Sequence, residues 1–165
     1  MSRVKNPYTR TSIQQVIDAA VANCDFMIQR SGAQIKIEGK MPEIVCDRIK
    51  TTAVFSNLIS NAVKFVGTSG CPVVKIGWRD TLKDYEFTVQ DNGIGIDQAH
   101  HQEIFDIFKR LHTGDEYDGT GVGLSIVKAA LEDQGGHVRV ESQVGRGTKF
   151  IFTIPKGLNA YRPLL

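Results

Sequence analysis

The segment Asp47–Val66, with the sequence DRIKTTAVFSNLISNAVKFV, constrains the fold more than any other part of the chain. It contains no Gly or Pro, and Asp47 can serve as an N-cap. Apolar residues recur at the spacing of one helical face, at Val54, Leu58, Ala62 and Phe65. The pattern predicts a long buried helix.

Three polar residues follow one line along this helix. At roughly 100° per residue, Asn57, Asn61 and Lys64 fall within about 60° of one another. A buried amide without partners costs about 1–3 kcal/mol, so the stripe must face a ligand, a metal ion or a hydrogen-bond network. From this helix alone, a satisfied pair of core amides explains the pattern equally well.

Length and composition indicate one domain. A chain of 165 residues with 41% hydrophobic content can bury one substantial core. Its formal charge is +2 and its basic residues are scattered, which does not favour nucleic acid as a partner. No apolar run approaches the roughly 20 residues that span a bilayer, and the N-terminus has no signal-peptide core. We therefore expect a soluble, cytoplasmic domain without membrane contact.

The cysteines are odd in number and widely spaced in apolar contexts, at Cys24, Cys46 and Cys71. This pattern predicts buried free thiols in a reducing compartment, rather than a disulfide or metal site.

Helical periodicity predicts two further helices. One begins at a capping box formed by Ser12 and Gln15 and ends at residues 31–32. The other begins within the glycine-rich run 119–123 and ends at residues 135–136. Glycines ahead of a helix N-terminus can expose backbone N–H groups to a phosphate, although GTGVG alone is a weak signal.

Alternating residues predict short strands at residues 33–38, 42–46, 73–78, 85–90, 137–141 and 149–154. Adjacent strand pairs mixed with helices favour a two-layer sandwich with helices on one face of a mixed sheet. Residues 1–10 resemble an entering linker and residues 156–165 a C-terminal tail, with one domain over residues 11–155 between them. Residues 97–118 are polar and irregular and are typical of a lid, one end of which Phe105 and Phe108 could anchor. Between Leu111 and Gly119 too few apolar groups remain for firm packing, so we expect mobility there.

Asp91 follows a predicted strand in the sequence DNGIGID. Alternation with Phe87 and Val89 places its carboxylate on the inward side, where a charge requires strong donors. Gly93 and Gly95 permit tight turns and close approach of a planar ligand. An ordinary turn at the end of a strand is the alternative interpretation.

The motifs NLISNAVKF, DNGIGI, IFDIFKRLH and GTGVGLSIVK resemble, in order and spacing, the N, G1, F and G2 boxes of sensor histidine kinase ATP-binding domains. The resemblance covers about residues 11–155 and is greatest to the phytochrome-like histidine kinases. It implies an α+β fold, a two-layer α/β sandwich of the GHKL (Bergerat) ATPase type. It also implies ATP and Mg²⁺ as cofactors.

The same resemblance implies roles for individual residues. Asp91 would accept a hydrogen bond from the adenine amine, Gly93 and Gly95 would let the main chain close on the base, and Asn61 would coordinate Mg²⁺. Asn57 and Lys64 would meet phosphate or metal-bound water. The remaining implied ATP-binding residues are Ile96, Phe108, Lys109, Arg110, His112, Gly119, Thr120, Gly121, Val122, Gly123, Leu124 and Thr148. For Arg110 and His112, surface charge without ligand contact is the alternative, and Phe108 is a better lid anchor than a base-stacking residue.

Gyrase, mismatch-repair and heat-shock members carry a water-activating glutamate one helical turn before the metal-binding Asn, where this chain has Asn57. An amide cannot act as a general base, so transfer to an acceptor is favoured over hydrolysis, and no catalytic residue is assigned. None of the histidines lies in a phosphoacceptor context. We therefore expect a monomeric catalytic fragment, or a domain that works in trans. Its partner would be a dimerisation domain that carries the acceptor histidine, with a response regulator acting indirectly.

Two other functions stay open at this point. One is a free-standing serine/threonine kinase of the anti-sigma-factor type, against which the aromatic IFDIFKRLH segment argues. The other is a non-catalytic, ATP-dependent interaction module.

Overall fold

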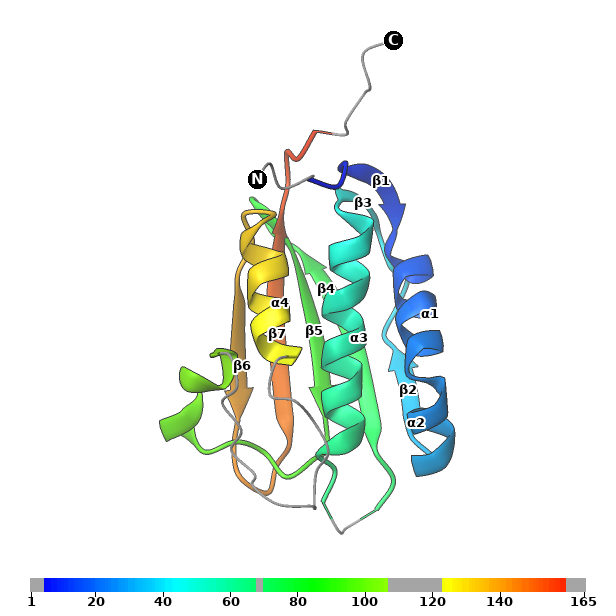
Figure 1. The fold of residues 1–165 in the computed structure, drawn as a ribbon, viewed down its shortest axis with the longest axis vertical. Helices are drawn as coiled ribbons and strands as arrows, with labels where there is room; N and C mark the ends of the chain where they lie inside the picture. The colour runs from blue at the N-terminus through cyan, green and yellow to red at the C-terminus, as the bar shows by residue number, and fades with distance from the viewer. Residues whose placement is uncertain (1–4, 68–69, 107–122, 160–165) are drawn as a thin grey trace.

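In the part of the chain that the structure describes, a five-stranded mixed sheet is covered on one face by four helices, so the predicted α+β two-layer sandwich is confirmed (Figure 1). The structure is a computed structural model that describes residues 5–67, 70–106 and 123–159. Its strand order is β2-β4-β5-β7-β6; β2 pairs with β4 in parallel and the other neighbours are antiparallel. Among these described residues, no helix is long and apolar enough to cross a membrane.

The helices are α1 (Ile13–Asn23), α2 (Asp25–Ser31), α3 (Arg48–Lys64) and α4 (Gly123–Glu132). Two short 3₁₀ turns cover Gln98–His100 and Glu103–Phe105. The strands are β1 (Thr9–Ser12), β2 (Gln34–Ile37), β3 (Glu43–Cys46), β4 (Val73–Asp80), β5 (Asp84–Asp91), β6 (Val138–Ser142) and β7 (Thr148–Pro155).

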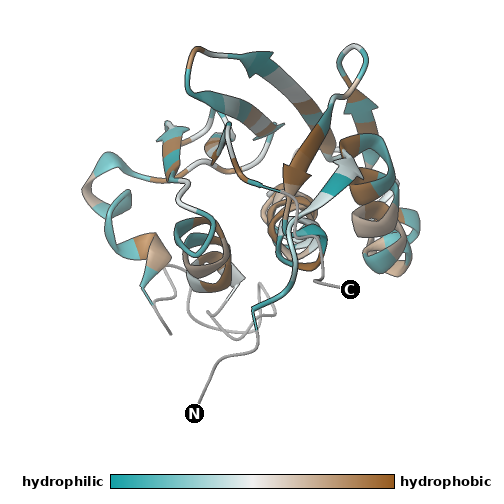
Figure 2. Cartoon of the chain, turned by 90° about the horizontal axis from the view of Figure 1, so that it is seen from above, coloured by the Kyte–Doolittle hydropathy of each residue, from teal (hydrophilic) through white to brown (hydrophobic). Residues whose placement is uncertain are grey.

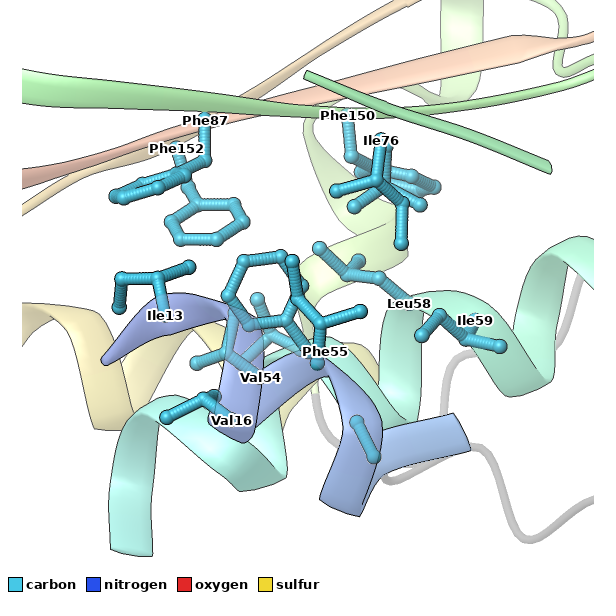
Figure 3. Packing of buried hydrophobic residues seen from close by; sticks show 14 of the residues in the cluster. Ile13, Val16, Val54, Phe55, Leu58, Ile59, Ile76, Phe87, Phe150 and Phe152 are labelled. Atoms are coloured by element: carbon cyan, nitrogen blue, oxygen red, sulfur yellow. The ribbon is translucent and has the colours of Figure 1, made fainter. Parts of the chain in front are cut away.

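Helix α3, the long buried helix that its sequence predicted, lies between α1 and α4 in the helical layer (Figure 1). The Asp47 carboxylate caps it by accepting a hydrogen bond from the Lys50 N–H at 3.0 Å. The Phe55 ring on its buried face meets Phe87 and Phe152 edge-on, with centroid distances of 5.8 and 5.2 Å (Figure 3). This aromatic contact joins the helical layer to the middle of the sheet.

Alternation along the central strands builds the inner face of the sheet. Phe87 and Val89 of β5 lie opposite Phe152 and Phe150 of β7, and all four side chains are buried. The two layers can be followed from above in Figure 2, where hydropathy is coloured residue by residue. The core therefore lies between the sheet and the helices.

Helix α4 is tied to the start of α3 by polar contacts at its C-terminal end. The buried Gln134 side chain accepts a hydrogen bond from the Asp47 N–H at 2.9 Å and donates to Ala130 O at 3.2 Å. Lys50 of α3 forms an ion pair with Asp133 at 2.6 Å. These contacts orient α4, so that its first residue, Gly123, lies beside the middle of α3.

The first predicted helix is in fact two helices. Cys24, with φ −104° and ψ 8°, separates α1 from α2, and its thiol donates a hydrogen bond to Ser56 O at 3.5 Å. The apolar periodicity continues across the break because Met27 and Ile28 still pack on the core. The helical periodicity of the sequence therefore could not reveal the break at Cys24.

Two further sequence expectations were wrong. Thr9 and Arg10, expected within a linker, pair with Cys46 and Val45 of β3 in a separate two-stranded sheet, because backbone pairing needs no apolar pattern. Cys24 and Cys46 are buried as expected, whereas Cys71 is exposed. Cys71 lies two residues before β4, and its thiol donates a hydrogen bond to Gly32 O at 2.7 Å.

Candidate functional site

The inner face of the sheet changes from apolar to polar at one end. Along β6 and β7, paired residues Val138–Phe152 and Val140–Phe150 are followed by the pair Ser142–Thr148. On the next strand, Asp91 continues the series of Phe87 and Val89 and lies beside Thr148. Three hydrophilic side chains from three strands therefore form one row beneath the helical layer.

Asp91 is the acidic member of this row, as predicted. Its Oδ1 accepts hydrogen bonds from the Gly93 N–H at 2.8 Å and the Thr148 N–H at 3.1 Å. Burial raises the pKa of the carboxyl group from 3.8 to about 6, and these two hydrogen bonds oppose the rise. Within the described ranges, no protein donor is hydrogen-bonded to Oδ2. The carboxylate therefore keeps an acceptor for a ligand.

The glycines after Asp91 are required by contacts within the protein. A Cβ on Gly93 would lie well under 3.0 Å from Phe65 O, and one on Gly95 would lie equally close to Gln143 O. The turn is held by the hydrogen bond from Ile94 N to Phe65 O at 2.9 Å. Close approach therefore occurs between the turn and its neighbouring main chains, and the contact of these glycines with a base stays a prediction.

Gly95→Ala is expected to destabilise the domain much more than Gly39→Ala. Both glycines have φ +75°, where an L-residue costs about 1–2 kcal/mol, but no atom lies within 4 Å of a Cβ at Gly39. The clash with Gln143 O should add at least about 2 kcal/mol at Gly95. Urea unfolding of the two variants measures the difference, and equal losses would contradict this account of the turn.

The predicted polar stripe lies on the C-terminal half of α3, and this helix ends beside the turn that follows Asp91. Asn57 Nδ2 donates to Ala53 O at 2.8 Å, and its Oδ1 would lie 2.9 Å from a Cβ on Gly123. Asn61 and Lys64 are half-buried, and their side chains form no hydrogen bond or ion pair with another described residue. Of these three side chains, only that of Asn57 is hydrogen-bonded to another described residue.

The segment 96–105, which follows the Gly93–Gly95 turn, is anchored to strands β6 and β7. The Ile96 N–H donates to Ser142 Oγ at 2.7 Å, and the Phe105 ring packs edge-on against Phe150 at 6.2 Å. His100 pairs with Glu103, and His101 Nε2 lies 3.0 Å from Ile96 O. Phe105 is thus an anchor, as predicted, and both histidines have local structural partners.

Leu124 lies in the first turn of α4, partly buried against the core. Several predicted site residues lie outside the part of the chain that the structure describes: Phe108, Lys109, Arg110, His112, Gly119, Thr120, Gly121 and Val122. The expected lid and phosphate-binding run therefore stay predictions.

Ser142 belongs to the site but was missed by sequence reasoning. Its Oγ contacts Ile96 N, Gly147 O at 2.9 Å and Thr148 Oγ1 at 2.8 Å. The predicted strand ended at Glu141, one residue too early. Alternation from Val138 and Val140 would have placed Ser142 on the inner face.

Comparison with known proteins gives a family match. The model of the family described as histidine kinase-, DNA gyrase B-, and HSP90-like ATPase matches residues 46–158. The chain is 48% identical over 150 residues to the phytochrome-like protein Cph1 of Synechocystis sp., covering 90% of this chain and 20% of that protein. It is 42% identical over 147 residues to cyanobacterial phytochrome A of Nostoc sp., covering 89% and 19% respectively. The chain thus spans about a fifth of these relatives.

Solved structures share the fold. The catalytic domain of histidine kinase ThkA has a TM-score of 0.73 at 26% identity, covering 90% of this chain and 97% of that one. The mycobacterial sensor histidine kinase MprB has a TM-score of 0.75 at 21% identity, with the same coverage. The chain therefore belongs to the family of histidine kinase-, DNA gyrase B- and HSP90-like ATPases, and is, as its four sequence boxes predicted, a catalytic domain of the histidine kinase type.

Proposed function

We propose that this domain binds Mg-ATP and donates the γ-phosphoryl group to a histidine on a separate dimerisation domain of a two-component sensor histidine kinase. The observation that carries the proposal is the geometry of Asp91, whose carboxylate is held at the end of the inner face by two main-chain N–H groups. A desolvated carboxylate with one oxygen still open suits the exocyclic amine of adenine.

The residues around Asp91 fit the rest of the nucleotide. Asn61 offers an amide oxygen, a ligand type that Mg²⁺ accepts, and Lys64 lies one turn further toward the same end of α3. The start of α4 faces Asn57, which suits phosphate at a helix N-terminus. When bound, Mg²⁺ would neutralise charge on the triphosphate.

Asn57 favours phosphoryl transfer over hydrolysis. Its Nδ2 donates to Ala53 O, which turns the amide oxygen toward the start of α4. An amide has no proton-accepting role at neutral pH, so Asn57 cannot serve as a general base for a water molecule near this helix. Transfer then depends on positioning an acceptor and neutralising charge.

Labelled ATP and Mg²⁺ can be mixed with this domain and a purified dimerisation domain carrying the acceptor histidine of a phytochrome-like kinase. Acid-labile, alkali-stable label on that histidine is the expected result. Acid-stable phosphoserine on an added protein would instead favour the anti-sigma type of serine/threonine kinase. ATP binding without transfer would favour an interaction module, and absence of ATP binding in calorimetry would contradict all three functions.

A further inference from the structure

We propose that Ser142 is a positioning residue for base selectivity: it orients the Thr148 hydroxyl so that the row beside Asp91 offers only hydrogen-bond acceptors to the 6-position of a purine. The inference rests on the proposed ATP site. It assigns a role in selectivity to the member of the row that lies furthest from Asp91, on β6, and that is expected to make no nucleotide contact.

The neighbours of Ser142 Oγ decide where its single proton points. This hydroxyl has one proton and two lone pairs, and it has three neighbours: Ile96 N at 2.7 Å, Gly147 O at 2.9 Å and Thr148 Oγ1 at 2.8 Å. The N–H of Ile96 can only donate and the carbonyl of Gly147 can only accept. One lone pair of Ser142 Oγ therefore accepts the Ile96 N–H, and its single proton is donated to Gly147 O.

The remaining contact then has only one direction. Because the Ser142 proton points to Gly147 O, the Thr148 hydroxyl must donate to Ser142 Oγ. The opposite assignment would leave Ser142 Oγ and Gly147 O facing each other at 2.9 Å without a hydrogen. Thr148 is thus left with lone pairs alone.

Asp91, like Thr148, presents only hydrogen-bond acceptors. Its Oδ1 receives the N–H groups of Gly93 and Thr148, and an ionised carboxylate can only accept. Thr148 is buried, and its main-chain N–H contacts this carboxylate at 3.1 Å, so the two side chains are immediate neighbours on one sheet face. A purine with an amine at position 6 meets matching acceptors, whereas a carbonyl there meets lone pairs.

ATP and inosine triphosphate (ITP) test this polarity, because ITP carries a carbonyl in place of the amine. We expect the wild-type domain to bind ITP at least about 10-fold more weakly than ATP in calorimetry. In Ser142→Ala the Thr148 proton is released and can rotate toward a carbonyl, so the ratio of the ITP and ATP dissociation constants should fall about 5-fold or more. Ser142→Thr, which keeps a hydroxyl, should retain the wild-type ratio.

The ratio of the ITP and ATP dissociation constants separates a change in base selectivity from a general weakening of the site. Loss of a partner for Ile96 N in Ser142→Ala weakens the site for both nucleotides alike, so an unchanged ratio would overturn the proposal. Thr148→Val removes the hydroxyl by another route and should also lower the ratio, which keeps the test decisive if Ser142→Ala does not fold. Failure of the wild-type domain to bind ATP would instead contradict the proposed function itself.

Discussion

Asp91→Asn is expected to abolish ATP binding and at the same time to stabilise the nucleotide-free domain. An asparagine can still accept the hydrogen bonds from Gly93 and Thr148 through its oxygen. Its amide nitrogen, however, turns a donor toward the adenine amine, and two donors cannot pair. A loss of at least about 100-fold in ATP affinity should appear in calorimetry, because a site built around one hydrogen-bonding pattern strongly rejects a mismatch.

The gain in stability follows from the pKa of Asp91. Its folded-state value of about 6 exceeds its ordinary value of 3.8, so the ionised carboxylate destabilises the fold above pH 6. The full difference corresponds to about 3 kcal/mol, and solvent near this half-buried group reduces the expected gain for Asp91→Asn to about 1–3 kcal/mol at pH 8. As pH falls from 6 to 4, wild-type Asp91 takes up a proton and the gain should disappear.

Urea unfolding at pH 8 and pH 4, without nucleotide, measures this effect. Asp84→Asn is the matched control, because it makes the same chemical change at the opposite end of β5. The control should leave ATP affinity unchanged. An Asp91→Asn domain that binds ATP as tightly as wild type would contradict the proposed recognition of the base.

Asn61→Ala is expected to remove Mg²⁺-dependent phosphoryl transfer while leaving the fold intact. The Asn61 side chain forms no hydrogen bond with another described residue, so its truncation costs little in folding free energy. Charge stabilisation by a bound metal is worth several kcal/mol, so transfer should fall on the order of 100-fold. Thermal unfolding and label transfer to the acceptor domain measure the two quantities.

Ser60→Ala is the control for this variant. Ser60 precedes Asn61 on α3 but its hydroxyl contacts Met27 Sδ at 3.8 Å, away from the polar stripe. Transfer by the control should match wild type. Full Mg²⁺-dependent transfer by Asn61→Ala would show that the metal ligand lies elsewhere.

Local pattern was sufficient for most of the fold. Asp47 and Ser12 cap α3 and α1 as expected, because N-capping depends on neighbours within three residues. Period-two alternation correctly turned Phe87 and Val89 inward and placed Asp91 on the same side, although β5 extends one residue further than predicted and includes Asp91. The resemblance of the four boxes led to the family that the comparisons show. These features depend on residues close together in sequence, or on motifs long enough to be specific.

Contacts between distant segments were decided only in the tertiary structure. The break at Cys24, the pairing of Thr9 with β3 and the exposure of Cys71 all depend on which segments become neighbours. The same is true of Gly93 and Gly95, whose necessity comes from the main chains of Phe65 and Gln143.

Within the site, the surroundings of Ser142 were decided by tertiary contacts, whereas other features follow from local sequence. By itself, the sequence determined that an inward carboxylate, a stripe of amides and a glycine-rich helix start occur in one chain, because each follows from a local repeat. Only the folded sheet decided that Ser142 and Thr148 lie beside Asp91, because strand register joins residues that are far apart along the chain. The direction of a hydroxyl proton depends on all of its neighbours at once, and those neighbours exist only after folding.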